Sequence, residues 1–474
     1  MEKSVFFIAF SVWMWYNGSK EKEGVFMRYT VRQTPCGSVR GVDTLEGYAY
    51  FRNLPYGKAD RWEKPVEVTA WEGEYDASTP TPWCPQGAAY APEKDRYAGF
   101  YAYENIVKQP NPYSEDCQRL NIWVPDGAEK LPVLVYIHGG SYASGGSSNP
   151  AYESSKYAKR GLVAVTINYR LNAFSVAVGG GHTGNYGLWD QVCALQWIRH
   201  NIAAFGGDPD RVTIIGESAG AMSVQDLLWS PLAKGLFHGA IMMSGGGILP
   251  NFFCRRKPRE MERIWEIIRQ SLGAKDWEEL KALPAETIFR TWTKITTREK
   301  YLTPATPVID GLTIPDEPAE LVKAGKVNNV PMIIGLLSED MWPQTLYEAA
   351  LEWGILMEAA NCGPVYGYYF DRQLPGSDHG AFHGGDIRYT FGTFRTSWRP
   401  FEEVDYRISE NIMDYFTAFA KTGVPAAENL AVWEPLGKNQ TRFLHFGDEP
   451  CGMIDVPTDH LTEVQVKNKP FPQL

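Results

Sequence analysis

Short runs of apolar residues recur through the middle of the chain and predict strands that are buried on both faces. Inside these runs, polar and apolar residues do not alternate as they would in a strand with one face in water. Unbroken runs of this kind are typical of parallel sheets whose two faces are both covered by helices. The predicted strands lie at 133–137, 162–167, 212–215, 240–243 and 331–335.

Between two of these strands the apolar residues follow the spacing of a helix. Leu188, Val192, Leu195 and Ile198 recur about once per helical turn, so they predict a crossover helix with one apolar face. A strand, a helix and a further strand in succession indicate one large α/β domain.

Two longer stretches frame this centre. Residues 29–123 are β-rich and are expected to form an antiparallel beginning to the same sheet. Residues 250–326 are helical and charged, and are expected to form an excursion over the carboxyl edge of the sheet, where open α/β sheets bind ligands. Because no linker, repeat or charge block divides the chain, we expect a single domain at 27–474, preceded by an N-terminal extension at 1–26.

The extension contains an apolar run at 5–16, which is too short for a membrane span. The run has the length of a signal-peptide core, but it is rich in bulky aromatic residues and no small-residue cleavage site follows it. Alternatively Met27 is the natural start, since 27–31 reads as a plain first strand. We therefore expect a cytoplasmic protein, or a secreted one if residues 1–26 act as a signal peptide.

Composition narrows the class of protein. Hydrophobic residues make up 44% of the chain and charged residues 22%, values that suit a soluble globular protein with a large core. A net charge of −10 without a basic patch argues against a nucleic-acid partner. The seven cysteines contain no C-x-x-C pair, which argues against a zinc site. Cys193 is expected in the core, and Cys84 and Cys117 could bridge in an oxidising compartment, although their spacing does not decide this.

The first candidate for chemistry is Ser218, in the sequence Gly-Glu-Ser-Ala-Gly at 216–220. This pentapeptide follows a predicted strand and precedes a helical sequence. A serine at such a sharp turn needs small neighbours and presents its hydroxyl at the head of the helix, which is the arrangement of a nucleophile elbow.

A serine nucleophile needs a base, and that base is usually a histidine oriented by a carboxylate. His383 is the strongest candidate, because its small flanking residues at 380–385 would let an imidazole project. A metal site formed with His379 is disfavoured by the intervening Gly380 and by the missing glutamate of an H-E-x-x-H pattern. The remaining histidines after the serine are less suitable: His238 lies too near the elbow's helix, and His445 and His460 lie near the tail.

The carboxylate is expected after the predicted strand 331–335, where Glu339 and Asp340 are both candidates. The chain order serine, acid, histidine is that of α/β-hydrolases. The segment 137–142, Ile-His-Gly-Gly-Ser-Tyr, follows another strand and is an HGGG-type oxyanion loop in which serine replaces the third glycine.

These motifs together resemble the type-B carboxylesterases, the family of bacterial para-nitrobenzyl esterases, animal carboxylesterases and cholinesterases. The resemblance covers about 51–425, and Gln118 replaces the leucine usual after the S-E-D-C motif. The motifs that carry it are 51–56 with 61–62, 114–117 with 120–123, 185–191, 201–209, 216–220, 230–237 and 380–392.

The resemblance implies an α/β-hydrolase fold with a large, mostly parallel central sheet flanked by helices. It makes Ser218 the nucleophile and His383 the base, and it assigns the oxyanion hole to the N–H groups of Gly140, Ser141 and Ala219. The family places glutamate five residues after a glycine, and the same count from Gly335 reaches Asp340, so Asp340 is the expected acid and Glu339 the alternative.

The function implied is carboxylic ester hydrolysis through an acyl-enzyme, with no metal or organic cofactor. The expected partner is a small-molecule ester, with no membrane span and with a monomer or homodimer as the assembly. Amide, carbamate or lactone hydrolysis on the same triad is the alternative. A non-catalytic binding member of the fold is a further alternative, disfavoured because Ser218, His383 and a carboxylate are all present.

Overall fold

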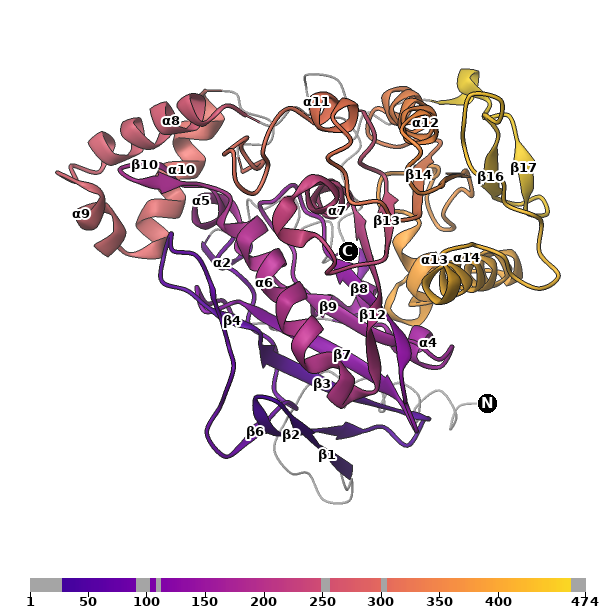
Figure 1. Ribbon diagram of the computed structural model, residues 1–474, viewed down its shortest axis with the longest axis horizontal. Coiled ribbons are helices and arrows are strands. Elements are labelled where there is room, and N and C mark those ends of the chain that lie inside the picture. Colours follow the sequence, from indigo (N-terminus) through magenta and orange to yellow (C-terminus); the bar gives the residue numbers. More distant parts are fainter. Residues whose placement is uncertain (1–27, 91–102, 108–111, 249–255, 300–304, 462–474) are drawn as a thin grey trace.

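The computed structural model describes residues 28–90, 103–107, 112–248, 256–299 and 305–461. The expected extension at 1–26 lies outside these residues. Within them, one 13-stranded sheet runs through the molecule in the order β1-β2-β3-β7-β9-β8-β12-β13-β14-β15-β16-β17, with β6 beside β2 (Figure 1). Its strands are β1 (Arg28–Thr34), β2 (Gly37–Asp43), β3 (Tyr48–Pro55), β6 (Glu74–Asp76), β7 (Arg119–Pro125), β8 (Leu131–Ile137), β9 (Val163–Ile167), β12 (Gly207–Glu217), β13 (Gly239–Met243), β14 (Met332–Leu337), β15 (Val365–Phe370), β16 (Phe443–Phe446) and β17 (Gly452–Ile454).

The sheet is parallel at its centre and antiparallel at its beginning. Successive strands from β9 to β16 in this order pair in parallel, whereas successive strands from β1 to β9 pair antiparallel, as the sequence predicts. Beyond these, β6 pairs with β2 in parallel and β17 pairs with β16 antiparallel. The five predicted strands are present as β8, β9, β12, β13 and β14. All five differ from the predicted bounds by at least one residue at an end. The largest difference is in β12, which begins at Gly207 and passes through a bulge before Val212, and β14 continues to Leu337.

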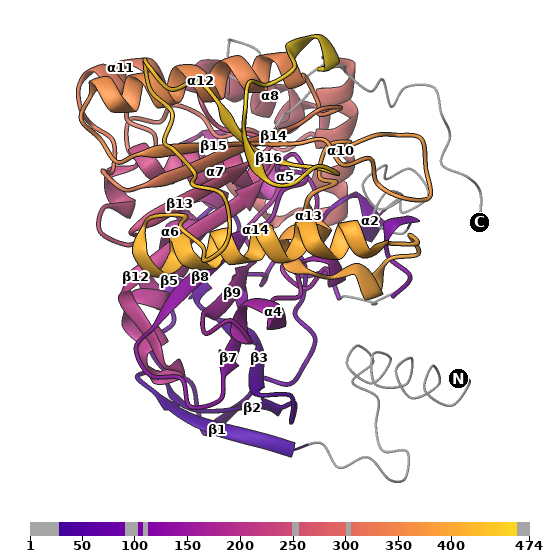
Figure 2. The same ribbon diagram turned by 90° about the vertical axis from the view of Figure 1, so that its right-hand side faces the viewer.

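Helices cover both faces of the sheet, which explains the unbroken apolar runs. Along β8, Val133 and Val135 enter one core with α6 (Tyr186–Asn201) and α7 (Ala219–Trp229), while Leu134 and Tyr136 enter a second core with α14 (Glu403–Thr422). Figure 2 shows α14 lying across that second face. The helices are α2 (Gly87–Tyr90), α4 (Ser155–Ala158), α5 (Asn172–Ser175), α6 (Tyr186–Asn201), α7 (Ala219–Trp229), α8 (Pro258–Ser271), α9 (Trp277–Ala282), α10 (Ala285–Arg298), α11 (Pro318–Lys323), α12 (Pro343–Ala359), α13 (Ile387–Phe391) and α14 (Glu403–Thr422).

The predicted helical excursion is present as α8 to α11, and α8, α9 and α10 form a separate group at the upper left of Figure 1. The described residues also form two small two-stranded sheets: β4 (Gly57–Lys58) with β5 (Val66–Glu67), and β10 (Val178–Gly179) with β11 (His182–Thr183). Cys193 is buried in α6, and Cys84 and Cys117 form a disulfide. In the described part of the chain, every helix is too short or too polar to cross a bilayer.

Candidate active site

Ser218 occupies a strained turn between β12 and α7. Its backbone has φ 56° and ψ −122°, a region that non-glycine residues rarely adopt and that is typical of functional sites. The two flanking glycines are sterically required, because a Cβ on Gly216 would lie 2.4 Å from the carbonyl carbon of Gly220. The serine hydroxyl therefore stands at the N-terminus of α7, as expected for a nucleophile elbow.

His383 joins this serine to a buried carboxylate. The Nε2 atom lies 2.8 Å from the Ser218 hydroxyl, and Nδ1 lies 2.5 Å from Oδ1 of Asp340. With the proton on Nδ1, the imidazole donates to Asp340 and accepts from the serine, which is the orientation that a general base needs. The carboxylate of Asp340 is buried and also accepts the N–H groups of Leu337 and Met341, so its position is set by the end of β14.

Of the two candidate carboxylates, Asp340 contacts the imidazole and Glu339 contacts the backbone beside it. Glu339 accepts the N–H of Ala381 at 2.8 Å and the hydroxyl of Ser338, and it forms a β-bridge with Phe382. The bridge and the hydrogen bond hold the loop that contains His383 against the end of β14. The close approach explains how an aspartate, one methylene shorter than glutamate, reaches His383.

The other histidines considered from the sequence have different surroundings. His238 accepts the N–H of Val212 through Nδ1, and His445 pairs with Asp371. His460 is exposed and lies beside Asp459, and His379 contacts the ring of Phe382.

The predicted oxyanion loop lies backbone-to-backbone against the elbow. A Cβ on Gly220 would lie 2.1 Å from the carbonyl oxygen of Ile137, and a Cβ on Gly139 would lie 2.5 Å from the carbonyl oxygen of Glu217. This approach brings the loop to the start of α7, where the N–H of Ala219 is among those that have no partner inside the helix.

The third position of that loop is unusual. Ser141 has φ 55° where the usual motif has glycine, and it follows Gly140 at φ 102°. A side chain is thus accepted in a left-handed conformation, at a cost of roughly 1–3 kcal/mol that the surrounding structure must offset.

Two further carboxylates, neither singled out by the sequence reasoning, lie beside His383. Oε1 of Glu217 is 3.3 Å from Nε2 of His383, and Asp386 accepts a hydrogen bond from the hydroxyl of Tyr368. Burial raises the pKa of Glu217 to about 8 and that of Asp386 to about 7. Glu217 directly precedes the serine and Asp386 ends the 380–386 motif, but neither position by itself indicates proximity to the imidazole.

These carboxylates control the charge of the histidine. Burial by itself would lower the pKa of His383, but the negative charges of Asp340, Glu217 and Asp386 outweigh it and raise the pKa to about 9. A general base must be neutral, so we expect kcat/KM for ester hydrolysis to rise with pH up to about this pKa.

The Glu217→Gln substitution is expected to move this rise to lower pH. The variant lacks one of the charges that stabilise the imidazolium, so the pKa of His383 falls. The pH dependence of kcat/KM for a para-nitrophenyl ester, corrected for spontaneous hydrolysis, measures the shift. Glu153→Gln is a suitable control, because burial also raises the pKa of Glu153, while the charges that raise the pKa of His383 are those of Asp340, Glu217 and Asp386. An unchanged or higher apparent pKa in Glu217→Gln would contradict the expectation.

Comparison with known proteins identifies the family. The family model described as "Carboxylesterase family" matches residues 28–352 and 344–467, nearly the whole chain. The chain belongs to the carboxylesterase family. Para-nitrobenzyl esterase of Bacillus subtilis (strain 168) is 30% identical over 482 residues, covering 88% of this chain and 94% of that protein. Human cocaine esterase is 30% identical over 491 residues, covering 88% of this chain and 85% of that protein.

Solved structures show the same similarity for this carboxylesterase. A PNB esterase superposes with a TM-score of 0.77 at 28% identity, covering 92% of this chain and 99% of that structure. A carboxylesterase of Geobacillus stearothermophilus superposes with a TM-score of 0.75 at 27% identity, covering 91% of this chain and 98% of that structure. The fold is therefore the α/β-hydrolase fold, and the protein is a carboxylic ester hydrolase of the serine-hydrolase type. Both expectations from the sequence are confirmed.

Proposed function

We propose that Ser218, His383 and Asp340 are the catalytic triad of this esterase and that it acts on small-molecule esters through a covalent acyl-enzyme. The observation that carries the proposal is the hydrogen-bonded chain from the Ser218 hydroxyl through His383 to Asp340, placed at the head of α7 beside the oxyanion loop.

In the first half of the reaction, His383 accepts the hydroxyl proton through Nε2 while the serine oxygen attacks the ester carbonyl. The charge that develops on the carbonyl oxygen is stabilised by the N–H groups of Gly140, Ser141 and Ala219. Asp340 stabilises the imidazolium, which then protonates the departing alcohol.

In the second half, His383 takes a proton from water and the resulting hydroxide attacks the acyl group on Ser218. Collapse of the second tetrahedral intermediate releases the carboxylic acid and returns the proton to the serine. Ser218 is only partly buried and about a quarter of the His383 side chain is exposed (23%), so a substrate carbonyl and a water can reach them.

The acyl-enzyme can be detected directly. Esters with one acyl group and different alcohols should give the same ratio of methyl ester to acid when methanol competes with water, because all of them pass through the same intermediate. Mass spectrometry should locate the acyl group on the peptide containing Ser218. A ratio that depends on the leaving alcohol, or acylation at a different residue, would overturn the proposal.

Matching amides, carbamates and lactones test the alternative substrates, and we expect esters to react fastest.

A further inference from the structure

The oxyanion loop that follows β8 is a tight turn whose shape sets the direction of its N–H groups. The carbonyl oxygen of Gly140 accepts the N–H groups of Ala143 at 2.9 Å and Ser144 at 3.0 Å. Because donors must lie within a few tenths of an ångström of their working positions, the residues that hold this turn affect transition-state stabilisation directly.

The side chain of Gln86, which lies outside the sheet, forms hydrogen bonds to the loop. Gln86 is 2% exposed, and its side-chain Nε2 donates to the carbonyl oxygens of Gly145 at 2.9 Å and Cys84 at 3.0 Å. Its Oε1 accepts the N–H of Gly145 at 3.0 Å. The amide therefore pairs with both backbone groups of Gly145, and both of its N–H groups have acceptors.

Gly145 packs closely against the residues that precede the oxyanion donors. A Cβ on Gly145 would lie 2.5 Å from Nδ1 of His138 and 2.8 Å from the carbonyl oxygen of Gly139. The backbone of Gly145 is thus packed against the residues that directly precede Gly140. A shift of Gly145 would leave Gly139 without this support.

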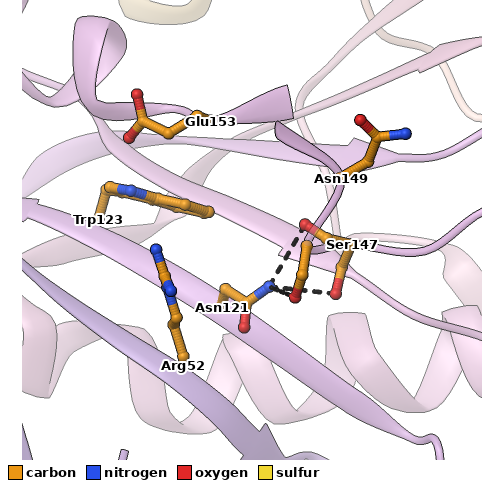
Figure 3. A pocket seen from close by; sticks show the side chains of 7 residues that line it. Arg52, Asn121, Trp123, Ser147, Asn149 and Glu153 are labelled. Atoms are coloured by element: carbon orange, nitrogen blue, oxygen red, sulfur yellow. Dashed lines mark hydrogen bonds between the residues drawn. The ribbon is translucent and has the colours of Figure 1, made fainter. Parts of the chain in front are cut away.

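Other contacts hold different parts of the loop. Tyr142 accepts the N–H of Asn172 at its carbonyl oxygen. At the far end, Asn121 on β7 donates to the hydroxyl of Ser147 at 3.1 Å, beside a cavity of about 10 Å³ (Figure 3). Gln86 holds the stretch between these two points. It lies two residues after Cys84, which a disulfide joins to Cys117, and its amide donates to the carbonyl oxygen of Cys84.

We propose that Gln86 is a positioning residue for the oxyanion hole of this esterase. The inference rests on the proposed function, since it assumes that the N–H groups of Gly140 and Ser141 stabilise the oxyanion. Gln86 itself touches no reacting atom in this proposal. It maintains the geometry of the loop, so its loss should weaken binding of the transition state more than binding of the substrate.

Two substitutions test this. Gln86→Leu removes all three hydrogen bonds, and Gln86→Glu keeps the acceptor but, when ionised, cannot donate to Gly145 and Cys84. Each is expected to lower kcat by about 10- to 100-fold with little change in KM, less than the loss of a whole oxyanion donor. The affinity of a trifluoromethyl ketone, which forms a tetrahedral adduct with the serine, should fall by a similar factor. Inhibition by the product alcohol should stay unchanged.

Gln118→Leu is the matched control. Gln118 is also a fully buried glutamine beside a half-cystine, but within the described residues its amide has no hydrogen-bond partner. Its replacement should leave kcat and ketone affinity unchanged. Melting curves and titration of folded active sites express each value per folded molecule, so that a variant of low stability still gives a result.

The outcomes separate this inference from the proposed function. Gln86 variants with wild-type kcat and ketone affinity per folded molecule would overturn the role of Gln86 while Ser218→Ala remained inactive. Equal losses in Gln118→Leu, or a change confined to KM, would also overturn it. If Ser218→Ala kept the activity, the proposed function would fail together with this inference.

Discussion

Replacing Ser218 by alanine is expected to lower kcat for para-nitrophenyl butyrate on the order of 10⁶-fold, the largest effect that we predict. The variant lacks the oxygen that attacks the carbonyl, and His383 has no hydroxyl to deprotonate. The oxyanion loop and the substrate site remain, so a small rate above the spontaneous one should persist. The measurement is single-turnover and steady-state release of para-nitrophenol, with a preparation free of wild-type enzyme.

Ser223→Ala is the control for this substitution. Ser223 lies on the same helix, is buried, and accepts a hydrogen bond from Gln191 rather than from the imidazole. Its loss should cost about 1 kcal/mol of stability and leave kcat within a few-fold of the wild type. Appreciable turnover by pure Ser218→Ala would show that a different group is the nucleophile.

The second largest effect is expected for Asp340→Asn, which should lower kcat by about 10⁴-fold. An amide cannot stabilise the imidazolium, and its NH₂ group can hold the ring in the wrong tautomer by donating to Nδ1. Asp340 also accepts two backbone N–H groups, so the melting temperature must be measured alongside activity. Asp340→Glu, which keeps the charge but must fit an extra methylene into a buried site, should retain more activity than the asparagine variant.

Glu339→Gln distinguishes the two neighbouring acids. A glutamine can still accept the N–H of Ala381 through its carbonyl oxygen, so the bridge between the two loops can persist. Its kcat should therefore fall far less than that of Asp340→Asn. A larger loss in Glu339→Gln than in Asp340→Asn would refute the assignment of Asp340 as the acid.

Much of the fold could be predicted because burial on both faces leaves a simple pattern. The strands β8, β9 and β13 are almost continuously apolar, since successive apolar side chains enter one or the other of two cores. Thr166 on β9 is a buried polar exception, and its hydroxyl donates to the carbonyl oxygen of Ser147. The start of β12 at Gly207 could not be predicted, because the polar residues between Gly207 and Val212 carry no apolar pattern and their pairing depends on a bulge beside β8.

The candidate site also has features that the sequence could predict and features that it could not. Ser218 and the oxyanion loop are recognisable because backbone crowding restricts their neighbours to glycine and other small residues. Glu217 and Asp386 were missed as neighbours of the imidazole. Their effect on its pKa depends on distance and burial, which spacing along the chain does not encode.

By itself, the sequence indicated the α/β-hydrolase class, the elbow at Ser218 and the chain order of the candidate serine, carboxylate and histidine. Burial on both faces and steric crowding leave local patterns at the strands and at the elbow, and the chain order can be read directly from those patterns. Only the tertiary structure decided which of two adjacent carboxylates contacts His383, and that Gln86 holds Gly145. Both depend on contacts between segments far apart in the chain: the bridge from Glu339 to Ala381, and the amide of Gln86 against the oxyanion loop. Hydrogen bonds across such separations depend on how the elements pack together, and no local pattern of residues specifies that packing.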